Sequence, residues 1–356
     1  MRYVPTFCLR EGMVLAKSLY GAGGVLLLKS GEKLQSQHIA HLARRGFQGV
    51  YIFDKLSEEI EIESVIDDEL RNSAAMAVEE AFARSGTGGL NRETLGRVKT
   101  SVRDIVEEIV ENRDAMVNMI DLKSYDTYTY YHSVDVGVLS VVVGVALGMK
   151  TKALYKLGLG ALMHDIGKVF IDSSIIRKAD CLTNEEYAQV KKHPELGYGY
   201  LAGSGLDFPV SALTGVLQHH ERMDGSGYPK GLTDGGIEKM SRIISVADVY
   251  DAMTSDRPYR QALMPSEAME YLMGGAGTLF DPEIVFLFTR KVAAFPLGTC
   301  VMLSNGMKAI VVENYEDCCL RPKVRLIGGA GAEPVCLDLK DDASLSNLTI
   351  TKVVRM

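Results

Sequence analysis

The sequence of 356 residues lacks several features that mark large classes of protein. It carries no excess of positive charge, because its formal net charge is −7 at pH 7, and this argues against a protein that follows long nucleic acids by charge alone. Its six cysteines form no Cys-x-x-Cys pair, so the sequence predicts reduced thiols. Internal repeats and low-complexity tracts are also absent from the sequence.

Long apolar segments are missing as well. The most apolar run, Val136 to Met149, has 14 residues, whereas a helix needs about 20 to cross a bilayer. We therefore expect a buried core helix here and no membrane span. Arg10 and Glu11 interrupt any apolar run near the N-terminus, so no signal peptide is expected, and the predicted location is the cytoplasm.

The chain is long enough for two or three domains at about 150 residues each. Residues 1–56 alternate short strand-like runs with turns and one short helix, which predicts a small α/β module. Residues 57–124 have apolar residues at three- and four-residue spacing, typical of helices, and form a predicted linker or dimerisation region. Residues 125–295 read as a run of helices, and 296–356 as a small β module with Asn-Gly and Gly-Gly turns. The predicted fold class is mainly α, with a homodimer plausible through residues 57–124.

Five of the seven histidines lie in the predicted helical domain, and two aspartates accompany them. Burying so many imidazoles without partners would cost several kcal/mol for each. A metal centre satisfies them together, whereas the alternative treats them as ordinary polar residues of a helical core. The candidate ligands are His132, His164, Asp165, His193, His219, His220 and Asp248.

The ligand types indicate which metal is bound. Imidazole and carboxylate without thiolate suit Fe or Mn better than a structural zinc site of the cysteine type. Seven ligands are too many for one ion that keeps a coordination position open for water. They suit two divalent ions bridged by a carboxylate, the arrangement that recurs for in-line attack on phosphorus. Asp165, adjacent to His164, is the candidate bridge.

Further residues near these ligands suit a phosphate substrate. Lys168 lies three residues after Asp165, about one helical turn on, and is predicted to face the same site. Arg257 and Arg260 are predicted to hold a phosphodiester, although surface salt bridges are an alternative. Asp251, three residues after Asp248, is predicted to orient a ligand, with a plain surface acid as the alternative.

These motifs resemble a known family. Over about residues 125–295, the chain resembles the HD-GYP domain of bacterial cyclic dinucleotide phosphodiesterases, an HD-type metal-dependent phosphohydrolase with an all-helical core. The motifs that carry the resemblance are "YTYYHS", "HDIGK", "HPELGY", "HHERMDGSGYP" and "ADVYDAMTSDRPYR". The resemblance implies that all seven candidate ligands bind metal, although one of His219 and His220 could instead orient a ligand.

The resemblance also assigns roles to the loop after His220. Gly225 and Gly227 permit a tight turn that larger side chains would obstruct. The loop through Tyr228 is implied to contact substrate and to dock diguanylate cyclase (GGDEF) proteins. Glu221 and Asp224 are expected to tether this loop rather than to bind metal.

One departure from the family bears on the reaction product. Some members hold a third metal with a glutamate four residues before the first histidine, where this chain has Tyr128. We therefore predict a two-metal site. In the family, two-metal members tend to stop at the linear dinucleotide, which makes pGpG the predicted main product, with further hydrolysis to GMP left open.

The predicted function is hydrolysis of cyclic di-GMP to pGpG by an activated water, with Asp165 and Lys168 as catalytic residues. Lys168 is predicted to neutralise a phosphate oxygen or to protonate the leaving sugar oxygen. Lys168, Tyr228, Arg257 and Arg260 are the predicted substrate contacts. Two alternatives remain: an HD hydrolase that acts on 3′,3′-cGAMP or another nucleotide, and a non-catalytic receptor for a cyclic dinucleotide or a cyclase.

Overall fold

The structure is a computed structural model of the chain. It describes residues 1–354 except 22–24, 46, 48, 55–56, 58, 61, 63, 119–127, 179, 256–261 and 329–334. The chain divides into two compact units. A helical unit comprises Val65–Ala115 and Thr129–Lys291, and a β-rich unit comprises Met1–Ser64, Met116–Tyr128 and Val292–Met356. This confirms the predicted fold class, an all-helical core accompanied by small modules with strands.

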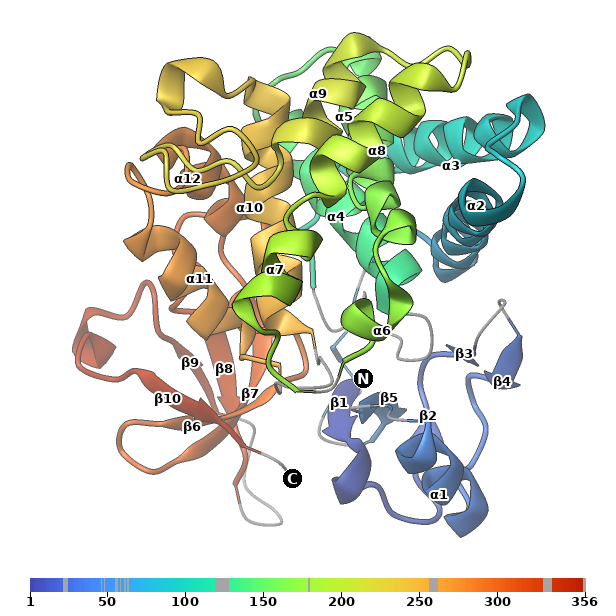
Figure 1. Cartoon of the computed structure of the whole chain (residues 1–356). Helices are drawn as coiled ribbons and strands as arrows, with labels where there is room; N and C mark the ends of the chain where they lie inside the picture. The colour runs from blue at the N-terminus through green and yellow to red at the C-terminus, as the bar shows by residue number, and fades with distance from the viewer. Residues whose placement is uncertain are drawn as a thin grey trace. The chain divides into compact units, whose positions relative to one another are not determined.

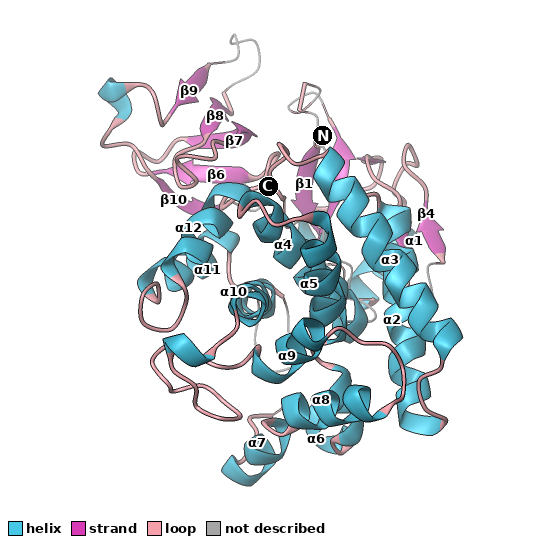
Figure 2. Cartoon of the chain, turned by 90° about the horizontal axis from the view of Figure 1, so that it is seen from above, coloured by secondary structure: helices cyan, strands magenta, loops and turns pink. Residues whose placement is uncertain are grey.

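The helical unit is built around α10, which Figure 2 shows end-on with other helices of the unit around it. Contacts join α10 to α5, α9, α11 and α12. The helices, also labelled in Figure 1, are α2 (Asp68–Thr87), α3 (Arg92–Glu111), α4 (Tyr128–Ala146), α5 (Thr151–Met163), α6 (Ser173–Ile176), α7 (Asn184–Val190), α8 (His193–Gly203), α9 (Val210–Gln218), α10 (Lys239–Thr254), α11 (Pro265–Gly274) and α12 (Pro282–Lys291), with the 3-10 helices η4 (Ile166–Phe170) and η5 (Asp234–Gly236).

Helix α4 contains most of the apolar run and forms part of the core, as predicted. Val136, Val138, Leu139 and Val141 are fully buried in it. At Gly137, a Cβ atom would lie 2.2 Å from a methyl group of Leu162, so glycine lets α4 and α5 pack closely. Among the described residues, no helix combines the length and hydropathy that a bilayer crossing requires.

The predicted helical region 57–124 supplies α2 and α3, and both belong to the helical unit. Helix α3 packs against α2 and α5, and α2 also contacts η4. A buried ion pair fastens α2 to α4: Arg71 donates to both carboxylate oxygens of Asp135, at 2.9 Å from Nε and 2.8 Å from Nη2. The homodimer expected for this region stays a prediction.

Local sequence signals explain where two helices begin. Thr183 and Glu186 form the predicted capping box at the start of α7, in which each side chain accepts from the other residue's backbone N–H. Asp281 caps α12 by accepting from the backbone N–H of Glu283 at 3.0 Å, next to Pro282 at the first helical position.

The β-rich unit combines both ends of the chain. Tyr51 of β5 and Ile310 of β7 belong to one buried cluster with Ala16, Ile60 and Ile62, so the N- and C-terminal modules share a core. Among the residues that the structure describes, three antiparallel sheets have the strand orders β1-β5-β2, β3-β4 and β10-β6-β7-β8-β9. Their elements are β1 (Arg2–Pro5), η1 (Thr6–Cys8), β2 (Val14–Leu15), β3 (Leu19–Tyr20), β4 (Leu26–Leu28), α1 (Ser36–Arg44), β5 (Gly49–Phe53), β6 (Cys300–Leu303), β7 (Lys308–Glu313), β8 (Lys323–Leu326), β9 (Cys336–Asp338), η6 (Ala343–Leu345) and β10 (Ile350–Val353).

Candidate metal centre

The seven predicted ligands converge inside the helical unit, although they come from separate elements. Six of them are buried, and His220 is partly buried. The ends of helices supply several of the ligands: His164 caps the C-terminus of α5, His193 begins α8, and His219 caps α9. His132 lies in α4, Asp165 follows His164, His220 follows His219, and Asp248 lies in α10.

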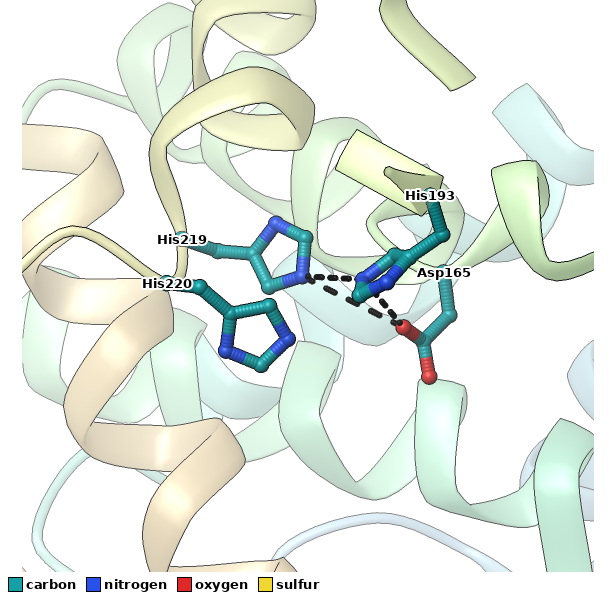
Figure 3. Close-up of side chains that lie close together, drawn as sticks. All are labelled: Asp165, His193, His219 and His220. Atoms are coloured by element: carbon teal, nitrogen blue, oxygen red, sulfur yellow. Dashed lines mark hydrogen bonds and ion pairs between the residues drawn. The ribbon is translucent and has the colours of Figure 1, made fainter. Parts of the chain in front are cut away.

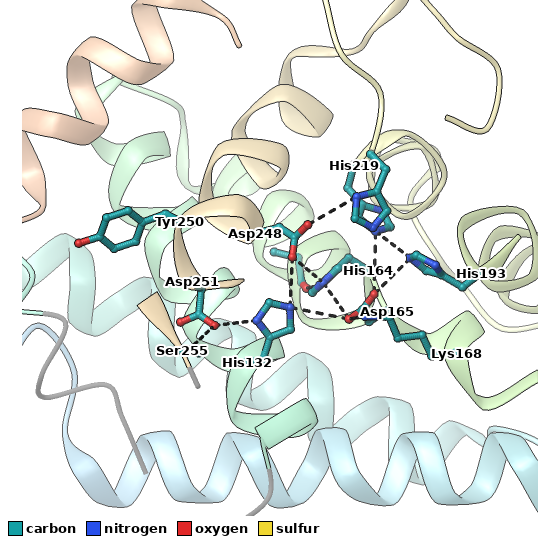
Figure 4. Close-up of polar contacts among 12 residues, drawn as sticks. His132, His164, Asp165, Lys168, His193, His219, Asp248, Tyr250, Asp251 and Ser255 are labelled. Carbon is teal, nitrogen blue, oxygen red and sulfur yellow. Dashed lines mark hydrogen bonds and ion pairs between the residues drawn. The ribbon is translucent and has the colours of Figure 1, made fainter. Parts of the chain in front are cut away.

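Asp165 lies at the centre of the cluster (Figure 4), and Figure 3 shows it facing His193 and His219. Its Oδ1 is 3.3 Å from His193 Nε2 and 4.0 Å from His219 Nε2. Its Oδ2 is 3.4 Å from His164 Nε2 and 3.7 Å from His132 Nε2. Two groups with the spacing of metal ligands therefore share this carboxylate, one on each side of it. They are Asp165 with His193, His219 and His220, and Asp165 with His132 and His164.

Asp248 closes the opposite side of the cluster (Figure 4). Its Oδ1 lies 3.2 Å from His132 Nε2 and 3.8 Å from His164 Nε2, and its Oδ2 lies 3.7 Å from His220 Nδ1. Asp248 thus faces histidines of both groups.

The histidine rings are oriented through their Nδ1 atoms. His164, His193 and His219 each place Nδ1 at 2.7–2.8 Å from the backbone carbonyl three residues earlier. Because a carbonyl only accepts, Nδ1 carries the proton in these rings, and the Nε2 lone pair is left for a cation. His193 Nε2 and His219 Nε2 lie 3.2 Å apart, which brings two such lone pairs together.

His132 is oriented by a carboxylate instead. Its Nδ1 lies 2.7 Å from Oδ2 of Asp251, which is 1% exposed, and Nε2 is directed at Asp165 and Asp248. This is the position predicted for Asp251, because a carboxylate behind a histidine fixes the tautomer of a ligand.

At Asp165, Asp248, His219 and His220, electrostatics favour the charge state that binds cations. Burial favours the neutral carboxyl of Asp165, but Lys168 and the neighbouring histidines outweigh burial and hold its pKa well below the ordinary value. At Asp248, burial is likewise outweighed by His132 and His220, and the pKa is lowered. Burial lowers the pKa of His219 and His220 well below the ordinary value, so these rings are neutral at pH 7. Neutral imidazole and ionised carboxylate are the states that metal binding requires.

These residues fit the binding of divalent cations. His164 Nε2 and Asp165 Oδ1 are buried, and within the described part of the chain neither has a hydrogen-bond partner. Burying two such acceptors with no donor is costly, and a cation relieves that cost. The donor set contains nitrogen and oxygen but no sulfur, which suits a divalent cation.

Two of the four predicted substrate contacts, Lys168 and Tyr228, border the cluster. The Lys168 ammonium pairs with Asp165 Oδ2, and its side chain is 25% exposed. The Tyr228 ring stacks on His220, with centroids 4.6 Å apart and planes at 27°. Arg257 and Arg260 lie outside the described residues.

The expectation that Glu221 and Asp224 tether the Gly-Tyr-Pro loop is confirmed. Glu221 accepts from the backbone N–H groups of Lys230 and Leu232 at 2.8 and 2.9 Å. Asp224 accepts from the backbone N–H of Ser226 at 2.9 Å.

Sequence reasoning missed two contacts that support the site. The Ser255 hydroxyl donates to Asp251 Oδ2 at 3.3 Å, and Asp135 lies one helical turn after His132 in its ion pair with Arg71. The aspartate directly before the apolar run Val136 to Met149 was the available signal for the second contact.

Comparison with known proteins places the chain in a family. A family model described as "HD domain" matches residues 105–284, which is half of the chain. The chain belongs to the HD domain family. This confirms the resemblance that its motifs predicted.

Relatives of this HD domain protein include phosphodiesterases. "Cyclic di-GMP phosphodiesterase PA4108" of Pseudomonas aeruginosa is 33% identical over 272 residues, which cover 74% of this chain and 64% of the relative. "Cyclic di-GMP phosphodiesterase response regulator RpfG" of Xanthomonas campestris is 35% identical over 54% of this chain and 51% of the relative. "3'3'-cGAMP-specific phosphodiesterase 1" of Vibrio cholerae is 36% identical over 47% of this chain and 38% of the relative. The chain thus spans less than two thirds of the length of each of these relatives.

A solved structure has the same fold. It is described as "Bd1817, a HDG"Y"P protein from Bdellovibrio bacteriovorus" and aligns with a TM-score of 0.51 at 20% identity. The alignment covers 80% of this chain and 96% of that one. At this identity, the likeness supports the fold of the HD domain protein and no finer property.

Proposed function

We propose that the seven converging side chains hold two divalent cations, Fe or Mn. His132 and His164 would hold one ion and His193, His219 and His220 the other, with Asp165 common to both groups and Asp248 at the opposite side of the site. The observation that carries this proposal is that two potential ligand groups share the Asp165 carboxylate. A pair of such ions supplies Lewis acidity and lowers the pKa of water, as phosphodiester hydrolysis at neutral pH requires.

We propose that the reaction is hydrolysis of cyclic di-GMP to linear pGpG. The support is the intact set of HD-GYP motifs together with two relatives whose names state this activity. Since Tyr128 stands where a third metal would need a carboxylate, the reaction is expected to stop largely at pGpG.

The chain's own residues account for binding and proton transfer in this proposal. Lys168 is proposed to contact a phosphate oxygen, and this is supported by the pairing of its ammonium with Asp165 and by the partial exposure of its side chain. From that position it neutralises charge on phosphorus or gives a proton to the leaving sugar oxygen. Tyr228 borders the substrate beside His220, and Arg257 and Arg260 hold the second phosphate through guanidinium groups.

Other parts of the proposal concern partners and location. The Gly-Tyr-Pro loop through Tyr228 is a proposed docking site for GGDEF cyclases, and α2 with α3 is a proposed dimerisation surface. An intracellular second messenger as substrate makes the cytoplasm the proposed location.

A second candidate substrate is 3′,3′-cGAMP. Two Vibrio cholerae relatives are named for this activity, at 36% and 32% identity. Cyclic di-GMP and 3′,3′-cGAMP differ in one base and would use the same metal ligands, so only contacts to that base distinguish the two candidates.

The test is anaerobic incubation of protein loaded with Mn²⁺ or Fe²⁺ with cyclic di-GMP and, separately, with 3′,3′-cGAMP. We expect cyclic di-GMP to give pGpG, and the variant with both His164→Ala and Asp165→Ala to give no product. Faster turnover of 3′,3′-cGAMP would favour the second candidate. Tight binding of cyclic di-GMP without turnover under either metal would contradict the enzyme and favour a receptor.

A further inference from the structure

The buried residue Glu221 directly follows two predicted metal ligands, His219 and His220, but its carboxylate accepts hydrogen bonds from backbone N–H groups. Glu221 is 2% exposed. One carboxylate oxygen accepts from Lys230 N–H at 2.8 Å and the other from Leu232 N–H at 2.9 Å. Both oxygens are therefore engaged by the chain segment that follows the Gly-Tyr-Pro turn.

The geometry of the loop depends on this attachment. The loop folds back over the backbone from which it departs, since a Cβ atom at residue 227 would lie 2.3 Å from Arg222 N. Glycine allows this close approach. Tyr228 N–H then donates to the His220 carbonyl at 3.2 Å, which places the tyrosine beside the second histidine of the pair.

Tyr228 in turn contacts His220 through its ring. The centroids lie 4.6 Å apart and the planes are inclined by 27°, so the rings are stacked. His220 differs from its neighbours in the cluster. Within the described part of the chain, His164, His193 and His219 have Nδ1 bonded to a backbone carbonyl and His220 has no such bond. Its Nδ1 faces Asp248 Oδ2 at 3.7 Å instead.

We infer that Glu221 is a positioning residue for His220. By holding the backbone at Lys230 and Leu232, it keeps Tyr228 stacked on His220 and so fixes that imidazole among the metal ligands. Glu221 does for His220, through the loop, what backbone carbonyls do directly for His164, His193 and His219. The inference rests on the proposed metal centre, but it does not depend on which phosphodiester is hydrolysed.

The test uses Glu221→Gln in the full chain, because glutamine keeps one carbonyl acceptor and replaces the other with an amide that cannot accept. Residues that orient ligands typically change metal affinity by 10- to 100-fold, so we expect Mn²⁺ to bind about 10-fold more weakly at one of two sites. Glu238→Gln is the control, since it is the same substitution at an exposed glutamate after the same loop. It should bind Mn²⁺ like the wild type.

Variants of Tyr228 test whether Glu221 acts through the Tyr228 ring or only through the overall stability of the fold. Tyr228→Phe retains a ring that can stack and should retain Mn²⁺ affinity, whereas Tyr228→Ala should weaken it as Glu221→Gln does. The double variant of Glu221→Gln with Tyr228→Ala should bind Mn²⁺ no more weakly than the single variant with the larger loss of affinity, because both substitutions act on one contact. Circular dichroism establishes that each variant is folded.

Wild-type Mn²⁺ affinity in folded Glu221→Gln, or additive losses in the double variant, would overturn the inference. Wild-type protein that binds two Mn²⁺ ions but hydrolyses no cyclic dinucleotide would overturn the proposed function alone, because the Mn²⁺ titrations measure positioning without substrate.

Discussion

The contact between Asp251 and His132 gives a quantitative prediction. Asp251 lies one turn after Asp248 on α10, and its Oδ2 is 2.7 Å from His132 Nδ1 in the buried interior. The carboxylate fixes the proton on Nδ1 and leaves Nε2 facing Asp165 and Asp248.

Asp251→Asn keeps the size of the side chain and removes its charge. The variant therefore loses the charge-assisted hydrogen bond that makes His132 a stronger donor to a cation. We expect Mn²⁺ affinity and kcat/KM each to fall by about 10- to 100-fold, which corresponds to about 1.4–2.7 kcal/mol. Mutation of a proposed ligand, such as His164→Ala, should have a larger effect.

Calorimetric titration with Mn²⁺ and initial rates with cyclic di-GMP measure the two quantities. Asp207→Asn is the matched control, because the Asp207 side chain is 99% exposed, and it should leave both unchanged. If Asp251→Asn binds Mn²⁺ and turns over substrate like the wild type, the reasoning that this hydrogen bond prepares His132 as a ligand is refuted.

Three further predictions concern the same site. Lys168→Met should lower kcat by at least about 100-fold while two ions remain bound. The control Lys152→Met, at an exposed lysine, should leave kcat unchanged. An unchanged kcat in Lys168→Met would show that Lys168 takes no part in the reaction. Burial lowers the pKa of His132, but its hydrogen bonds to Asp248 and Asp251 outweigh burial and raise that pKa to about 9, so at pH 7.5 the metal-free ring is protonated. Mn²⁺ binding at pH 7.5 should therefore release a proton, which calorimetry in buffers of different ionisation enthalpy detects. This proton release should vanish above pH 9. No proton release at pH 7.5 would contradict the assignment of His132 as a metal ligand. Removing metal by chelation should lower the melting temperature by about 5–10 °C relative to protein with Mn²⁺ at 100 times its Kd, and equal melting temperatures would argue against a metal centre of the folded state.

The sequence predicted the features that depend on local pattern. The apolar run from Val136 to Met149 identified a buried helix, because nearly uniform hydrophobicity is incompatible with a surface helix. Thr183 with Glu186 and Asp281 with Pro282 marked helix starts, since capping involves residues only a few positions apart. The motifs identified the residues that converge, although motif spacing alone carries no distances.

Contacts between distant segments could not be predicted in the same way. Tyr51 and Ile310 belong to one core cluster, yet each also suits an isolated module, so nothing in either segment indicates that they meet. Arg71 and Asp135 are separated by 64 positions, and their pairing depends on how α2 packs in the helical unit. The orientation of each imidazole likewise follows from backbone carbonyls that only the folded helix ends bring into place.

The most direct test of the metal centre is an anaerobic Mn²⁺ titration of metal-free wild-type chain beside Asp165→Ala. Because Asp165 belongs to both ligand groups, the account predicts two ions for each wild-type chain and weakened binding of both in Asp165→Ala. A wild-type chain that binds no Mn²⁺, or an Asp165→Ala chain that binds two ions with unchanged affinity, would contradict it.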